Sequence, residues 1–85
     1  MSDPFKQFAK FSPEAYAIYV YVNPGRVACS KSRDDLRVVD FGEDGRVVGV
    51  GFLRVSDGVD LSDVPEREKV ERLIDDLGLG IKIYV

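Results

Sequence analysis

The chain lacks histidine and tryptophan altogether and has a single cysteine, Cys29, among its 85 residues. The absence of histidine removes the commonest general base, the usual catalytic triads and most transition-metal sites. One cysteine cannot form an intramolecular disulfide, and Cys29 has neither a histidine partner nor a second cysteine to act with. We therefore interpret Cys29 as a small apolar strand residue, and we expect no catalytic residue, cofactor or metal site.

Long apolar runs are also missing, because no stretch approaches the roughly 20 residues of a transmembrane helix. The first ten residues have no signal-peptide core either, so we expect a cytoplasmic protein without membrane attachment. Basic residues number 12 and acidic residues 15, which gives a net charge of −3. General nucleic-acid binders carry a basic excess, so this balance argues against nucleic acid as a partner.

A chain of 85 residues forms one domain with a marginal core, and such domains often gain stability by oligomerising. Residues 11–85 are predicted to form a single α+β domain, preceded by an N-terminal arm, residues 1–10. In this arm Phe5 and Phe8 are spaced for a single helical turn after Pro4. The arm could anchor a partner or a membrane, or it could cover an edge of the core.

The clearest local signal is a hairpin between Leu36 and Val55, where two apolar runs flank Gly42-Glu43-Asp44-Gly45. Glu43 and Asp44 suit the centre of a type I turn, and Gly45 supplies the left-handed residue that closes it with a bulge. Strict alternation would then divide the second strand between two faces, with Val48, Val50 and Phe52 on one and Val47, Gly49, Gly51 and Leu53 on the other.

Two further strands precede this hairpin. Residues 16–22 are rich in aromatic and β-branched residues, and residues 26–31 form a weaker strand after the turn at Asn23-Pro24-Gly25. In the first of them alternation places Ala17, Tyr19 and Tyr21 opposite Ile18, Val20 and Val22.

The C-terminal part predicts one helix and one short strand. Asp63 and Glu66 have the spacing of a capping box, with Pro65 in the first turn and Gly78 as the stop. One helical face carries Val70, Leu73, Ile74 and Leu77, and Ile81–Val85 alternates like a strand. The predicted fold is α+β: an antiparallel β-meander of four strands, one C-terminal helix packed on one face through these residues, and a short last strand.

Residues 11–55 carry two stretches with a family likeness: Ser12-Pro13-Glu14-Ala15 followed by Ala17-Ile18-Tyr19-Val20, and Asp40-Phe41-Gly42-Glu43-Asp44-Gly45-Arg46-Val47-Val48-Gly49-Val50. They resemble the opening and the hairpin of a small uncharacterised bacterial family, the domain-of-unknown-function family 2283. Tyr16 stands where that family usually has aspartate, and Gly51 where it usually has glutamate. The resemblance implies a small, self-associating antiparallel sheet and implies no enzyme activity or cofactor.

Acidic residues cluster, mostly in loops, at Asp34–Asp35, Asp40, Glu43–Asp44 and Asp57–Asp60–Asp63. Such loops could hold magnesium or calcium and support a small metal-assisted enzyme, but their spacing matches no calcium loop. Aspartate is also a common turn and cap residue, and we interpret the clusters in that way. Gly49-Val50-Gly51 is too short for a phosphate loop and instead indicates close approach of another element.

The functional expectation is a non-enzymatic binding or regulatory module that acts as a homo-oligomer. The helix can cover only one face of the sheet, so the other face would stay apolar and aromatic, as on a dimer interface. The predicted interface residues are Tyr19, Tyr21, Val47, Gly49, Gly51 and Leu53. The alternative to a dimer is that the Phe5–Phe8 arm folds over this face within one chain. The functional alternatives are a toxin–antitoxin-like partner of another protein, a nucleic-acid-associated regulator whose tyrosines stack on bases, and the metal-assisted enzyme.

Overall fold

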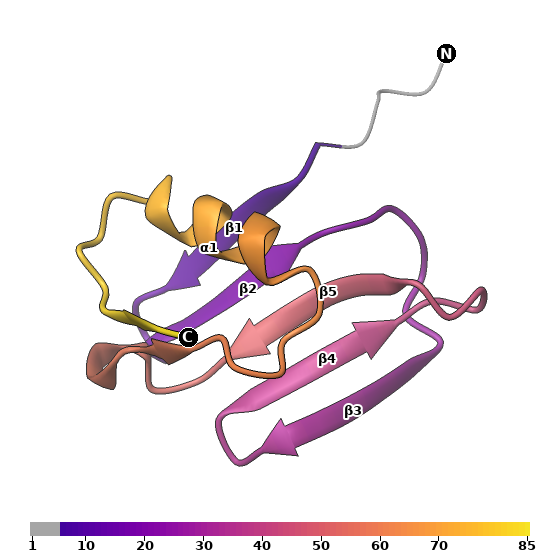
Figure 1. The fold of residues 1–85 in the computed structure, drawn as a ribbon, viewed down its shortest axis with the longest axis horizontal. Helices are drawn as coiled ribbons and strands as arrows, with labels where there is room; N and C mark the ends of the chain where they lie inside the picture. The colour runs from indigo at the N-terminus through magenta and orange to yellow at the C-terminus, as the bar shows by residue number, and fades with distance from the viewer. Residues whose placement is uncertain (1–5) are drawn as a thin grey trace.

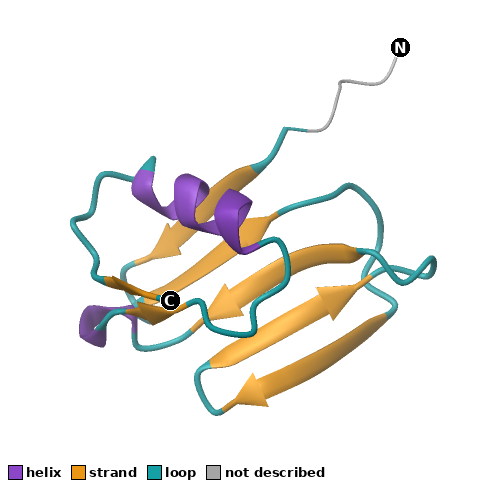
Figure 2. Ribbon diagram, viewed as in Figure 1, coloured by secondary structure: helices purple, strands orange, loops and turns teal. Residues whose placement is uncertain are grey.

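The computed structural model describes residues 6–85 and has two layers, a five-stranded antiparallel sheet and a layer that covers one of its faces (Figure 1). The covering layer contains the single α-helix, a short parallel strand pair and the segments between them (Figure 2). The α+β class with an antiparallel sheet is therefore confirmed. In chain order the elements are β1 (Phe8–Ser12), β2 (Ala17–Tyr21), β3 (Cys29–Asp34), β4 (Arg37–Phe41), β5 (Val47–Phe52), the 3-10 helix η1 (Val55–Asp57), β6 (Val59–Asp60), α1 (Arg67–Asp75) and β7 (Ile83–Tyr84).

The strand order is β1-β2-β5-β4-β3, which differs from a four-stranded meander. Hairpins join β3, β4 and β5, but β2 pairs with β5 rather than with its successor β3. The chain after β2 therefore passes the ends of β5 and β4 to reach the far edge, which is a Greek-key arrangement. Local turn signals predict the hairpins, but they carry no information on this long-range pairing.

The expected N-terminal arm is partly wrong, because residues 8–10 belong to edge strand β1. Phe8 pairs with Tyr21 and Ser12 with Ala17, and the Gln7 side chain donates to the Val22 carbonyl at 3.0 Å. The spacing of Phe5 and Phe8 suits a helical turn, but the alternation from Phe8 to Ser12 suits a strand equally well. These residues form a strand because the edge of β2 offers backbone groups for them to pair with. The part of the expectation that concerns Phe5 lies outside the described residues.

The β4–β5 hairpin turns as expected. Gly45 has a φ of 83°, its N–H donates to the Gly42 carbonyl at 3.0 Å, and the Arg46 N–H donates to the Asp44 carboxylate. The strict alternation predicted after this turn is wrong at its first residues, because a bulge shifts the register between Asp40 and Phe41. The bulge puts Val47 into the core cluster, while Val48 lines a hollow beside Tyr19 and Tyr21 on the opposite face.

Helix α1 packs over β1 and β2 with the predicted face, since Val70 and Ile74 are buried and Leu73 and Leu77 are half-buried. Its predicted start is wrong: Asp63 and Glu66 both have left-handed backbones, with φ of 61° and 59°, and no side chain caps the helix. These two turns bring Leu61 and Val64 into the core, so burial of apolar groups decides the path here rather than a capping box. Gly78 ends the helix region with a φ of 66°, as predicted.

The last strand is shorter than expected, Ile83–Tyr84, and runs parallel to β6. The Val59 N–H donates to the Lys82 carbonyl at 2.8 Å and the Leu61 N–H to the Tyr84 carbonyl at 2.7 Å. This pair closes the covering layer beside the helix.

Arg37 fastens the covering layer to the sheet. It lies opposite Phe52 on the covered face, and its guanidinium donates to the carbonyls of Ser62 at 2.6 Å and Asp60 at 3.2 Å. The Asp34 carboxylate accepts two further bonds from the same guanidinium, at 2.8 and 3.0 Å. The side chain of Arg37 is therefore almost fully engaged with β6 and its flanking segment.

Candidate functional site

The candidate site is the second face of the sheet, which we call the open face. Helix α1, β6, β7 and the segments that join them all lie over the other face (Figure 1), and no element between residues 6 and 85 packs on the open face. The strand registers place three rows of residues there. The rows are Ser12, Ala17, Leu53 and Leu36; Lys10, Tyr19, Gly51, Val38 and Ser32; and Phe8, Tyr21, Gly49, Asp40 and Ser30.

Charge is scarce in these rows. Lys10 and Asp40 are the charged members, and the Asp40 carboxylate accepts hydrogen bonds from the hydroxyls of Tyr19 at 2.5 Å and Ser30 at 2.6 Å. Lys10 lies on edge strand β1, where its side chain can reach solvent. The middle of the open face therefore presents aromatic, aliphatic and glycine surface without a free charge.

Tyr19 crosses β5 to reach Asp40. A Cβ atom at Gly49 would lie 2.3 Å from the Tyr19 hydroxyl oxygen and 2.5 Å from two ring carbons, so only glycine lets the ring lie there. At Gly51 the nearest ring carbon would be at 3.5 Å, an ordinary contact. The close approach predicted over the glycines is found at Gly49, where the Tyr19 side chain of neighbouring strand β2 fills the space. The prediction that Gly49 is open interface surface is therefore wrong.

The environment of Tyr19 favours its neutral form. Burial raises the pKa of the Tyr19 hydroxyl, and the hydrogen bond to the Asp40 carboxylate, together with its negative charge, raises it further. Tyr19 therefore acts as a fixed hydrogen-bond donor, and the pair ties β2 to β4 across β5.

An aromatic ladder continues from Tyr19 to the β1 edge. The rings of Tyr19 and Tyr21 meet edge to face with centroids 4.7 Å apart, and Tyr21 stacks on Phe8 at 4.4 Å with an interplanar angle of 19°. Phe8 is half exposed at the end of this ladder. The three rings make one continuous apolar strip over β1, β2 and β5.

A shallow hollow adjoins this strip at one end of the open face. The loop after β2 walls it, and the bulged Val48 contributes to its lining beside the two tyrosines. We call it the tyrosine hollow; its lining residues are Tyr19, Tyr21, Asn23, Pro24, Gly25, Val27 and Val48.

The structure places the six predicted interface residues in different settings. Leu53 is exposed. Its backbone N–H donates to the Leu36 carbonyl at 2.8 Å, which extends the hydrogen bonding between β5 and β4 by one residue. Tyr19, Tyr21 and Gly51 are partly buried on the open face, Gly49 is covered by Tyr19, and Val47 lies in the core. Phe8, which the sequence analysis considered as part of an arm folding over this face, lies there and stacks on Tyr21. Sequence reasoning gave Asp40 no part in this face and missed Leu36 and Val48.

The carboxylates of the acidic loop residues Asp34 and Asp60 accept hydrogen bonds from nearby backbone N–H groups. Asp34 accepts from the Leu36 N–H at 2.8 Å, and Asp60 accepts from both the N–H and the hydroxyl of Ser62. The Arg37 guanidinium and the backbone N–H of Leu36 lower the pKa of Asp34, and the Ser62 bonds lower that of Asp60. Across the described residues, no group of three histidine, cysteine, aspartate or glutamate side chains could hold a metal ion.

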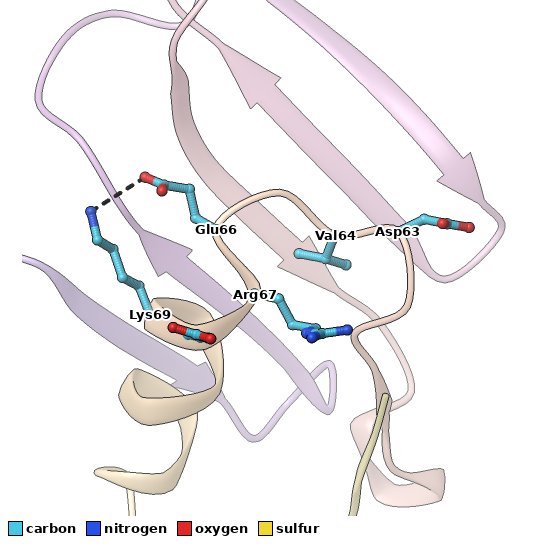
Figure 3. A pocket seen from close by; sticks show the side chains of 6 residues that line it. Asp63, Val64, Glu66, Arg67 and Lys69 are labelled. Carbon is cyan, nitrogen blue, oxygen red and sulfur yellow. Dashed lines mark ion pairs between the residues drawn. The ribbon is translucent and has the colours of Figure 1, made fainter.

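A second hollow lies at the start of α1 (Figure 3). It is open and charged, and an ion pair of 3.5 Å between Lys69 Nζ and a Glu66 carboxylate oxygen spans part of it. Its lining residues are Asp63, Val64, Glu66, Arg67, Glu68 and Lys69. Three acidic and two basic side chains are mixed along this rim, so charges of one sign do not gather there to bind a ligand.

Comparison with known protein families, curated proteins and solved structures finds no match to this chain. The resemblance to family 2283 therefore remains a prediction from its motifs. Among residues 6–85, none of the helices is long and apolar enough to cross a membrane.

Proposed function

We propose that this protein is a non-enzymatic binding module of the cytoplasm that acts as a homodimer through the open face of its sheet. The observation that supports this most directly is the composition of that face, which is aromatic and aliphatic in its middle and has its central carboxylate, Asp40, already engaged. Interface cores are enriched in aromatic residues and depleted of charge in the same way.

The other functions considered have less support. A single-stranded nucleic acid would meet Lys10 as the basic group in the rows of the open face, and a phosphate backbone requires more. A metal-assisted enzyme would need carboxylates free of structural duties, whereas Asp34, Asp44 and Asp60 hold turns. A different protein on the same face, as in a toxin–antitoxin-like pair, is the alternative that the same composition supports.

The test is the molar mass in solution, measured by size-exclusion chromatography with light scattering over a range of concentrations. The wild type should rise from its monomer mass of 9.5 kDa toward twice that value as concentration increases. Leu53→Glu, which adds a charge to the open face, should remain a monomer with its fold intact by circular dichroism.

Leu79→Glu is the matched control, because Leu79 is 44% exposed and Leu53 is 46% exposed, but Leu79 lies beside Phe11 and Tyr16 rather than in the open-face rows. This variant should still dimerise. A wild type that is monomeric at every concentration would contradict the proposal, as would equal loss of the dimer in both variants.

A further inference from the structure

Edge strand β3 and the segment before it differ from the rest of the protein in charge. Residues 26–33 contain three basic side chains, Arg26, Lys31 and Arg33, and no acidic one, although the whole chain carries a net charge of −3. All six residues of β3 are exposed, and no further strand of the sheet lies beyond it (Figure 1). None of the three basic side chains takes part in the ion pairs found among residues 6–85.

The outer edge of β3 has backbone groups that no strand of the sheet pairs with. The Leu53 N–H donates to the Leu36 carbonyl, and in an antiparallel ladder bonded and unbonded pairs alternate along a strand. Counting from Leu36, Val39 therefore directs its backbone groups to β3 rather than to β5. Lys31 lies opposite Val39, so its backbone bonds to β4. The serines on either side of Lys31 direct their N–H and C=O groups away from the sheet.

We infer that an acidic, extended segment of another protein pairs antiparallel with the outer edge of β3. The backbone of the segment bonds to Ser30 and Ser32, in the way that peptides extend exposed sheet edges in other recognition domains. Between these bonded pairs lies an unbonded pair, in which side chains are closest, and there an acidic residue of the segment meets Lys31. The inference goes beyond the proposed homodimer, because contact through the open face leaves this edge uncovered.

A second copy of β3 fits this edge poorly. Pairing Ser32 with Ser30 of another copy puts Lys31 opposite Lys31, and pairing Ser32 with Ser32 puts Lys31 opposite Arg33. Like charges directly opposite each other destabilise a strand pair, and basic side chains on edge strands commonly prevent self-association. An acidic strand converts the same contacts into ion pairs, so charge complementarity selects the acidic partner.

The regular part of this edge is short, which sets the expected affinity. The register shifts between Ser32 and Asp34, and the Asp34 carboxylate is already bonded to the Arg37 guanidinium. Pairing therefore extends over residues 29–32 and involves few contacts. We expect a dissociation constant of roughly 0.1–1 mM for an isolated peptide, as for a small and transient interface.

The probe is an end-blocked hexapeptide of alternating threonine and glutamate, titrated into the protein and followed by amide nuclear magnetic resonance. Shifts should change at Ser30 and Ser32, because threonines pair with these serines while a glutamate meets Lys31. N-methylation of the threonines removes the N–H groups that bond to β3 and should abolish these changes. N-methylation of the glutamates, whose N–H groups face solvent, is the matched control and should keep most of the binding.

Lys31→Glu should weaken binding of this peptide by about tenfold, because it turns an ion pair into a repulsion. The same variant should gain binding of the matching threonine–lysine peptide, which also shows that it is folded. Lys82→Glu is the matched control, since Lys82 is exposed and lies outside the five-stranded sheet, and it should bind like the wild type. A wild type without shifts at Ser30 and Ser32 at several millimolar peptide would overturn the inference, as would undiminished binding of the threonine-methylated peptide or equal losses in both variants.

Discussion

The covered face and the open face of this sheet use their large side chains differently. On the covered face Phe52 and Ile18 lie against aliphatic groups and are almost completely buried. On the open face Tyr19 lies flat over glycine and is held by a hydrogen bond to Asp40. Burial alone holds Phe52 and Ile18 in place. A hydrogen bond holds Tyr19 in place and leaves apolar surface of the open face exposed to a partner.

Phe52, the last residue of β5, and Leu53, which follows it, compare the two faces most directly. Phe52 is 1% exposed and Leu53 is 46% exposed. Phe52→Ala should lower the free energy of unfolding by about 3–5 kcal/mol, from lost transfer energy and the cavity. Leu53→Ala should change it by less than about 0.5 kcal/mol at concentrations where the protein is monomeric. Urea denaturation measures both values, and equal losses would show that the two faces are not distinct.

Arg37 tests how the covering layer is held. Arg37→Met removes donors to the Ser62 and Asp60 carbonyls and should cost about 1.5–3 kcal/mol, the range for hydrogen bonds to a charged group. Arg33, exposed on β3, is the matched control, and Arg33→Met should cost less than about 0.5 kcal/mol. If both variants unfold at the same urea concentration, the Arg37 contacts do not stabilise the covering layer.

The glycines of β5 test the tyrosine on the open face. Gly49→Ala should cost about 1–3 kcal/mol, because its methyl group would overlap the Tyr19 ring, and Gly51→Ala should cost clearly less. Adding Tyr19→Ala to Gly49→Ala should recover part of the loss in a double-mutant cycle. Additive effects in that cycle would mean that Tyr19 does not occupy the space over Gly49.

The smallest expected effect concerns acid stability. Because the folded protein holds the pKa of Asp34 below its ordinary value of 3.8, this carboxylate stabilises the fold above that pH, and the contribution is lost as pH falls through the lowered value. The melting temperature of the wild type should therefore fall more steeply on acidification than that of Asp34→Asn. Parallel curves would contradict a stabilising pair between Asp34 and Arg37.

Sequence reasoning succeeded where the signal is local. The turn at Gly45 and the apolar face of α1 depend on residues a few positions apart, and both are found as predicted. The start of α1 was missed although its signal was local, because burial of Val64 outweighs the capping box.

The candidate site was harder to predict because its contacts are distant in sequence. Tyr19 and Asp40 are 21 positions apart and meet only because β5 inserts between β2 and β4. The bulge that exchanges Val47 and Val48 lies in the β4–β5 hairpin, where the register shifts between Asp40 and Phe41. Alternation could therefore identify an apolar face, but it could not decide which residues remain free on it.

The most direct test of the central claim is a dilution series followed by amide nuclear magnetic resonance, from millimolar to micromolar protein. The claim predicts concentration-dependent shifts at Tyr21, Gly51 and Leu53 on the open face, with Val70 and Ile74 on the covered side unchanged. Spectra that do not change with concentration, or changes confined to α1 and the covering layer, would contradict it.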